Sequence, residues 1–166
     1  MSMQATYDRA PHDASQRILL VMLPAAQTSP QHLAQHGFIE AVRERKLPVD
    51  VVLAHADEGY YFERTVCSHL TDDIIAPARA ANCRRIWLMG ISLGGMGALL
   101  YAQAHAADIE GVILLAPYLG ASGSIAAIAN AGGLAHWQPA ANQMDDDDSR
   151  LLAWLKAYQP ACPVSP

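Results

Sequence analysis

Gly90-Ile91-Ser92-Leu93-Gly94 is the stretch that decides how this sequence folds. It follows an apolar run at 84–89, which is typical of a buried parallel strand, and it leads into a small-residue stretch at 94–101 that begins a helix. A serine between two glycines at such a junction predicts a sharp strand-to-helix turn that lifts the hydroxyl clear of a sheet. Small neighbours are needed because the serine backbone is strained and adjacent backbone must approach it closely.

Apolar runs and helical patterns alternate along the rest of the chain. Strands are expected at 17–24, 49–54, 84–89 and 110–116, and helices at 38–45, 66–78, 93–105, 124–130 and from Asp145 to Pro160. Ser29 and Pro30 can cap and begin a further helix, and Pro77 should kink the 66–78 helix or end it early. These spacings suit βαβ crossovers, so the sequence predicts an α/β fold with a parallel sheet and helices on both faces.

Composition and net charge limit which classes of protein this chain can belong to. The chain has 166 residues, of which 52% are hydrophobic and 16% charged, so most of it should be folded. Residues 1–16 are expected to form a flexible leader, and residues 17–166 a single domain. The net charge of −5 argues against a nucleic-acid partner. The sequence shows no signal-peptide pattern and no apolar stretch near the ~20 residues that cross a bilayer, so no membrane partner is expected.

The cysteines point to a reducing compartment. Cys67, Cys83 and Cys162 are odd in number, far apart, and free of any Cys-x-x-Cys or Cys/His ligand spacing. We therefore expect three free thiols in a cytoplasmic protein. No metal and no cofactor is implied.

Three stretches together resemble the α/β-hydrolase superfamily, in particular its small bacterial esterase-like serine hydrolases. They are Gly90-x-Ser92-x-Gly94-Gly95, Leu23-Pro24-Ala25-Ala26 and Leu115-Ala116-Pro117-Tyr118. The resemblance covers residues 17 to about 160. It implies an α/β-hydrolase-like sheet that is C-terminally incomplete, because the strands that follow in the family would lie beyond Pro166.

The resemblance also assigns roles to individual residues. Ser92 would be the nucleophile, and the backbone N–H of Leu93 would be one donor of the oxyanion hole. The second donor would come from the loop after the first strand, from Ala26 or Ala25. The other interpretation of Ser92 is a helix N-cap serine in a glycine-rich turn of a non-enzymatic domain.

A serine nucleophile needs a histidine base and a carboxylate, and the histidines after Ser92 can be tested by geometry. His105 lies thirteen residues along the helix, so at about 1.5 Å per residue it would be ~20 Å away and cannot be the base. His136 follows the fourth strand and is the one candidate base, although a surface or packing role beside Trp137 is the favoured interpretation. His55 and Asp57 also lie at a strand's carboxyl end, where Asp57, Tyr60 and Tyr61 should line a pocket or hold a loop.

The acids offer no clear partner for such a base. Asp108 and Glu110 precede the fourth strand, which puts them at the opposite end of the sheet. Asp145 to Asp148 form a charge run at a helix start, where the macrodipole favours them. In the family the acid and the base come from later strands, so this resemblance places both beyond Pro166.

The fourth strand would then be an edge strand with apolar side chains. Such an edge invites pairing, so we expect a homodimer or a swapped assembly through 112–116, unless the tail after Gly120 covers it.

The expected function is a carboxylesterase-like serine hydrolase that acts on small-molecule esters through a Ser92 acyl-enzyme and is impaired by the missing acid and base. The alternatives are an inactive binding or assembly module with the same fold, and an incomplete half that another polypeptide complements.

Overall fold

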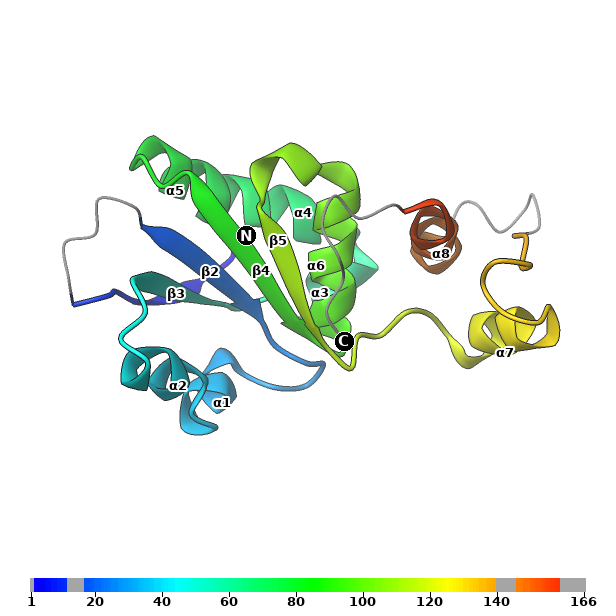
Figure 1. The fold of residues 1–166 in the computed structure, drawn as a ribbon, viewed down its shortest axis with the longest axis horizontal. Helices are drawn as coiled ribbons and strands as arrows, with labels where there is room; N and C mark the ends of the chain where they lie inside the picture. Colours follow the sequence, from blue (N-terminus) through cyan, green and yellow to red (C-terminus); the bar gives the residue numbers. More distant parts are fainter. Residues whose placement is uncertain (1, 12–16, 140–145, 159–166) are drawn as a thin grey trace. The chain divides into compact units, whose positions relative to one another are not determined.

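The computed structural model describes residues 2–11, 17–139 and 146–158. The chain divides into two compact units, Met1–Tyr118 and Leu119–Pro166, whereas the sequence predicts a single domain over 17–166. The first unit contains a five-stranded sheet with the order β1-β3-β2-β4-β5 (Figure 1). The strands are β1 Ala5–Asp8, β2 Ile18–Leu23, β3 Val49–Ala54, β4 Arg85–Ile91 and β5 Gly111–Leu115.

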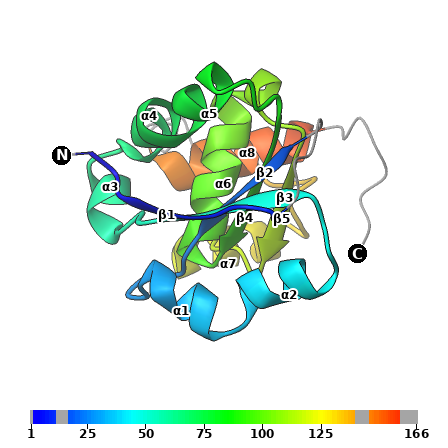
Figure 2. The same ribbon diagram turned by 90° about the vertical axis from the view of Figure 1, so that its left-hand side faces the viewer.

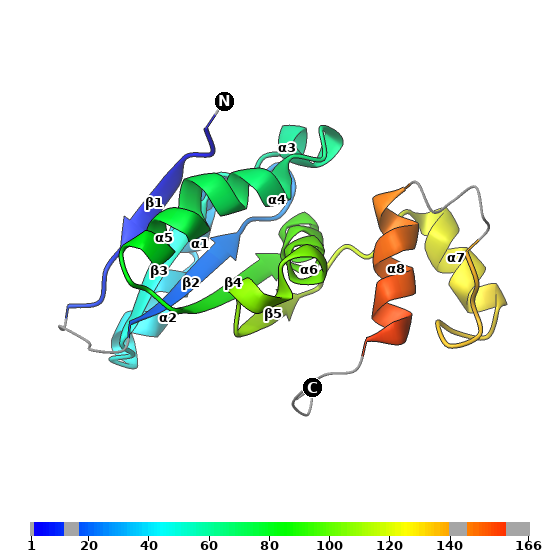
Figure 3. The same ribbon diagram turned by 90° about the horizontal axis from the view of Figure 1, so that it is seen from above.

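The inner strands form the predicted parallel sheet. β2 pairs in parallel with both β3 and β4, and β4 pairs in parallel with β5. In register, Val21 lies opposite Val52 on one side and Leu88 on the other, and all three side chains have no exposed surface. Figure 3 shows the strands side by side from β1 to β5. Near-continuous apolar runs are expected where a strand is covered on both faces, as these are.

Helices cover both faces of this sheet, as Figure 2 shows. The helices of the first unit are α1 Pro30–Gln35, α2 Phe38–Glu44, α3 Glu58–Phe62, α4 Val66–His69, α5 Ala76–Ala80 and α6 Leu93–Ala104. Alternate residues of β2 serve the two faces: Val21 packs with Leu70 and Tyr101, whereas Met22 packs with Leu33 and Val42. The predicted fold class is therefore confirmed.

A flexible leader is expected over residues 1–16, but Ala5–Asp8 forms strand β1, while residues 1 and 12–16 lie outside the described residues. Ala5–Asp8 pairs antiparallel with β3, which would otherwise be the edge of the sheet. Side-chain carboxylates hold the segment at both ends: the amide of Met3 donates to Asp73 at 2.7 Å, and the amide of Ala10 donates to Asp50 at 2.8 Å. Four residues of mixed polarity show too little periodicity to predict such a strand.

Of the two outcomes predicted for Pro77, a kink or an early end of its helix, the early end does not occur. α4 continues through a π-helical segment, Leu70–Ile75, into α5, which runs to Ala80. A proline lacks the N–H for the usual helical hydrogen bond, and its ring crowds the carbonyl four residues earlier. A wider π turn directly before Pro77 relieves both problems, so the helical path continues.

The second unit contains α7 Ser122–Asn130 and α8 Asp147–Ala157. α7 includes the helix predicted at 124–130 and ends just before two glycines with positive φ, Gly132 (81°) and Gly133 (112°). Asp146 caps α8 by accepting from the amide of Ser149 at 2.7 Å, and Asp148 accepts from the amide of Ala121 at 2.8 Å. These acids of the aspartate run therefore have structural roles. In the described parts of both units, no helix is long and apolar enough to span a bilayer.

Candidate active site

Ser92 lies at the bend between β4 and α6, where the sequence predicts a strand-to-helix turn. β4 ends at Ile91, α6 begins at Leu93, and Ser92 between them has φ 50° and ψ −113°. A non-glycine residue rarely adopts positive φ, and such strain costs about 1–3 kcal/mol. β4 lies between β2 and β5, so the half-buried serine stands at the carboxyl end of an inner strand.

The glycines around Ser92 are required by close backbone approaches. A Cβ on Gly90 would overlap the backbone of Gly94, and a Cβ on Gly94 would overlap the carbonyl of Leu23 at the end of β2. A Cβ on Gly95 would stand 2.7 Å from Cβ of Pro117, which follows β5. The segments after β2 and β5 therefore touch the first turn of α6, one from each neighbouring strand.

Backbone hydrogen bonds hold the bend in place. The amide of Ser92 donates to the carbonyl of Leu115 at 3.1 Å, and the amide of Tyr118 donates to the carbonyl of Ser92 at 2.8 Å. The same carbonyl accepts from Gly95 at 2.9 Å. The Ser92 hydroxyl, in contrast, caps no amide of α6, so the geometry does not support the role of a side-chain N-cap.

The two predicted oxyanion donors lie on neighbouring segments. Leu93 is the first residue of α6, and no backbone carbonyl among the described residues accepts from its N–H. Ala26 lies in the turn after Pro24. Thr28 closes this turn, because the amide and the hydroxyl of Thr28 donate to the carbonyl of Ala25 at 3.3 and 2.6 Å. The contact of Gly94 with the end of β2 brings this turn and the start of α6 together.

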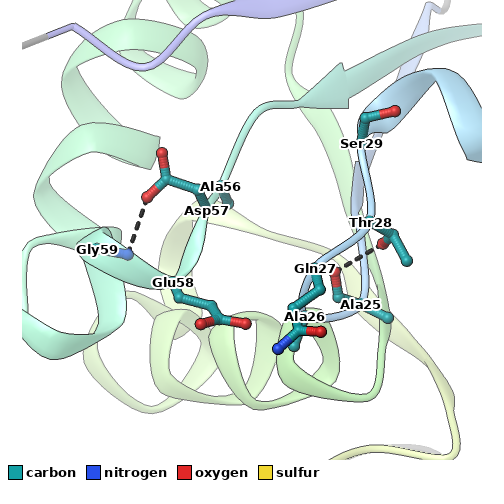
Figure 4. A pocket seen from close by; sticks show the side chains of 9 residues that line it. All are labelled: Ala25, Ala26, Gln27, Thr28, Ser29, Ala56, Asp57, Glu58 and Gly59. Carbon is teal, nitrogen blue, oxygen red and sulfur yellow. Dashed lines mark hydrogen bonds between the residues drawn. The ribbon is translucent and has the colours of Figure 1, made fainter.

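A pocket of about 460 Å³ opens between the loops that follow β2 and β3 (Figure 4). Its lining residues are Ala25, Ala26, Gln27, Thr28, Ser29, Ala56, Asp57, Glu58 and Gly59. Asp57 lines it and also holds the loop, because its Oδ1 accepts from the amide of Gly59 at 2.8 Å. Sequence reasoning missed Gln27 and Glu58, for which the only signal was their place after buried strands.

Tyr60 and Tyr61 are expected to line a pocket or to hold a loop, and they do not line this pocket. The ring of Tyr60 packs edge-on against His69, with ring centroids 4.9 Å apart. The hydroxyl of Tyr61 is buried, and a Cβ on Gly97 would stand only 2.6 Å from it. Burial raises the pKa of Tyr61 well above its usual value. Both tyrosines therefore belong to the packing of the helices on the sheet.

None of the described histidines forms a hydrogen bond with Ser92. His55 Nε2 lies 3.4 Å from Thr6 Oγ1, so it does not use Asp57 as a side-chain partner. His105 is the C-cap of α6, at the end far from the serine, and its ring packs against that of Tyr101. His136 is exposed in the second unit, with Nδ1 3.3 Å from the carbonyl of Gly132.

Sequence reasoning missed a histidine–carboxylate pair. It lies in the helical segment made of α4 and the π-helical residues Leu70–Ile75. His69 Nδ1 is 2.9 Å from Asp73 Oδ2, and Asp73 also accepts from the amide of Met3 and from the hydroxyl of Ser2 at 2.8 Å. Chiefly the hydrogen bond from Met3, and then that from His69, lower the pKa of Asp73. The i, i+4 spacing could have revealed the pair. Its partners give it the role of anchoring the N-terminal segment.

Glu110 and the cysteines complete the list of residues considered for the site. Glu110 accepts from Arg85 Nε at 3.0 Å and from Trp87 Nε1 at 3.1 Å, and these hydrogen bonds lower its pKa. Cys67 and Cys83 are in the reduced thiol form, and Cys162 lies outside the described residues. Over 2–11, 17–139 and 146–158, no group of three or more His, Cys, Asp or Glu side chains could hold a metal ion.

Comparisons with solved structures identify the fold. Est1E from Butyrivibrio proteoclasticus is 22% identical with a TM-score of 0.52, over 69% of this chain and 46% of that one. The monoacylglycerol lipase of Paleococcus ferrophilus is 17% identical with a TM-score of 0.54, over 80% and 51%. The bottromycin epimerase BotH is 16% identical with a TM-score of 0.52, over 80% and 52%. The chain thus spans about half the length of these structures.

Sequence comparison identifies the family. No curated protein matches the chain. The family model described as "Serine aminopeptidase, S33" matches residues 66–151, which is just over half of the chain and includes Ser92, α6 and β5. The chain therefore belongs to the serine aminopeptidase S33 family of the α/β-hydrolase superfamily.

Proposed function

We propose that this chain is a serine hydrolase that acts on carboxylic esters, with Ser92 as its nucleophile. The observation that carries the proposal is the strained backbone of Ser92, whose hydroxyl caps nothing at the carboxyl end of an inner strand. Strain of this kind persists only where surrounding contacts impose it, and it clusters at functional sites. Family membership and the esterase and lipase folds among its structural neighbours support the same reaction class.

The reaction would proceed through an acyl-enzyme. Ser92 Oγ attacks the ester carbonyl while a base removes the hydroxyl proton, and the alcohol leaves with a proton from that base. The N–H groups of Leu93 and Ala26 would stabilise the oxyanion of each tetrahedral intermediate, and one such donor is worth about 2.7–4 kcal/mol. Water then attacks the acyl carbonyl and releases the acid. None of these steps requires a metal or a cofactor.

The base and the acid are the open part of the mechanism. His136 is the candidate base that the sequence offers. We propose that the chain by itself is impaired, because none of the described histidines forms a hydrogen bond with Ser92. A serine hydrolase without its base and acid retains about 10³–10⁴-fold catalysis over water from the oxyanion hole and binding.

An inactive binding or assembly module is the second candidate. The absence of a hydrogen bond between Ser92 and any histidine among the described residues favours it. In a third arrangement another polypeptide supplies the acid and the base. Each candidate retains the small-molecule pocket at the carboxyl ends of β2 and β3.

A fluorophosphonate probe tests the proposal, because it reacts only with an activated serine. We expect stoichiometric labelling at Ser92 and none in the Ser92→Ala variant, with ester hydrolysis lost in the same variant. Absence of labelling in the wild-type chain would favour the inactive module. Labelling that appears only after another polypeptide is added would favour complementation.

We also propose a homodimer through the edge strand β5, in a protein of the cytoplasm. Ile113, Leu114 and Leu115 are 41%, 37% and 39% exposed, although their strand is apolar. Unpaired N–H and C=O groups beside such side chains are a template for another strand. A sedimentation coefficient that rises with protein concentration would support pairing, and a constant monomer value would contradict it.

A further inference from the structure

We propose that a second pocket, at the amino end of the sheet, binds a small carboxylic acid with an apolar tail. Its volume of about 360 Å³ lies within the size range of small-molecule sites, roughly 300–1,000 Å³. Ser92 follows the carboxyl end of β4, so this pocket lies at the opposite end of the parallel strands and is independent of the proposed function. The lining residues are Tyr7, Asp8, Arg9, Arg17, Leu19, Asp50, Val51, Ile74, Pro77, Ala78, Ala81 and Cys83.

The inner part of the pocket is apolar. Leu19, Val51 and Ile74 line it and are 5%, 0% and 1% exposed. Ile74 belongs to the π-helical segment Leu70–Ile75, which sets the path of the helix that forms this wall. Short π-helical segments occur often at functional sites. Buried aliphatic side chains at the base of a cavity favour an alkyl or aryl tail over a polar group.

The two acids that line the pocket already have partners. Asp50 accepts from the amide of Ala10 at 2.8 Å, and its other oxygen lies 3.5 Å from Arg17 Nη1. Asp8 forms an ion pair with Arg43, which does not line the pocket. Neither carboxylate is therefore an uncompensated negative charge in the pocket.

The unused hydrogen-bonding groups at the mouth of the pocket are guanidinium N–H donors. Arg9 is exposed, and among the described residues none forms an ion pair or a hydrogen bond with its guanidinium. Arg17 uses one of its five donors, at the long distance of 3.5 Å. Guanidinium groups pair with carboxylates through two parallel N–H donors. A carboxylate at the mouth would accept from both arginines, whereas an ammonium would be repelled by Arg9.

Ligands with a six-carbon tail test the site without any need for turnover. Hexanoate, hexanol and hexylammonium carry negative, no and positive charge. In amide NMR titrations we expect hexanoate to shift the resonances of Leu19, Val51 and Ala78. It should bind about fivefold more tightly than hexanol, which is the value of a charge pair at 4 Å in water, and hexylammonium should bind most weakly. Butyrate should bind more weakly than hexanoate, by up to about fourfold for each buried methylene.

Arg9→Gln isolates the charge. Because Arg9 is exposed, the variant should fold normally, bind hexanoate about fivefold more weakly and bind hexanol unchanged. Arg45→Gln is the matched control, since it removes the same charge from an exposed arginine that does not line the pocket. Equal affinity for hexanoate and hexanol, equal hexanoate affinity in wild type and Arg9→Gln, or shifts confined to residues outside the pocket would each overturn the site.

Cys83 offers a second measurement, because it lines the same pocket. Burial raises the pKa of its thiol, so alkylation by iodoacetamide is followed at alkaline pH, with peptide mass spectrometry as the readout. Saturating hexanoate should slow the alkylation of Cys83 and leave that of Cys67, which does not line the pocket, unchanged. Protection of both thiols alike, or of neither, would contradict the site. None of these measurements depends on Ser92, so their failure leaves the hydrolase intact, and a failure of fluorophosphonate labelling leaves the site intact.

Discussion

Gly94→Ala should damage stability and reactivity together, because Gly94 joins the end of β2 to the start of α6. A Cβ there would stand 2.5 Å from the carbonyl oxygen of Pro24 and closer to that of Leu23. Carbon–heavy-atom contacts are optimal near 3.5–4.0 Å, so one backbone segment must move by roughly 1 Å. Overpacking costs about 1–3 kcal/mol, and we expect ~3 kcal/mol because both obstacles are backbone atoms.

The same displacement would separate the amides of Leu93 and Ala26. A misplacement of ~1 Å can cost about 10²-fold in rate, so fluorophosphonate labelling of Ser92 should slow by that order. Urea unfolding followed by circular dichroism measures the change in the free energy of unfolding.

Gly123→Ala is the control for this experiment. A Cβ on Gly123, in α7, would meet no atom within 4 Å, so this variant should be neutral or more stable by about 0.4–1 kcal/mol. If Gly94→Ala unfolded at the wild-type urea concentration and labelled at the wild-type rate, the close approach of β2 to α6 would not exist as described.

Three further predictions concern other parts of the chain. Ser92→Gly should raise the free energy of unfolding by up to ~1 kcal/mol, since glycine tolerates positive φ, and should abolish labelling; a less stable variant in urea unfolding would argue against backbone strain. The pKa of Asp73 is lowered from its usual 3.8, so the unfolded chain binds more protons and stability falls as the pH drops below about that value. In Asp73→Asn this part of the acid loss should disappear from pH-dependent thermal unfolding, and an unchanged acid limb would contradict it. Ile113→Lys should abolish concentration-dependent sedimentation by charging the β5 edge, whereas persistent association would place the interface elsewhere.

The sequence predicts the inner sheet well because its strands are buried on both faces. The runs that contain Val21, Val52 and Leu88 are almost wholly apolar, and such runs leave few alternatives to a parallel strand. β1 was missed because an antiparallel edge strand is defined by its partner and by acceptors far along the chain, Asp50 and Asp73. The π turn before Pro77 was missed for a similar reason, since the packing of a helix and not its pattern decides how a proline is accommodated.

The candidate site was predictable only where its geometry is local. The bend at Ser92 follows from neighbouring glycines, so a short motif reveals it. The orientations of Glu58 and Gln27 depend on how two loops from different strands meet, and no spacing in the sequence encodes that. A partner for the serine is a distant residue by nature, so His136 stays a prediction.

The edge strand β5 and the residues that follow it help to hold Ser92 in its strained conformation. The carbonyl of Leu115 accepts from the amide of Ser92, and the amide of Tyr118 donates to the carbonyl of Ser92. Fraying of β5 would therefore relax the strained bend. A second chain that pairs with β5 would prevent this fraying and keep Ser92 in its strained conformation. Self-association and the reactivity of Ser92 would then rise together. Labelling per molecule should therefore increase with protein concentration, and a rate that stays flat across the association range would show that the two are independent.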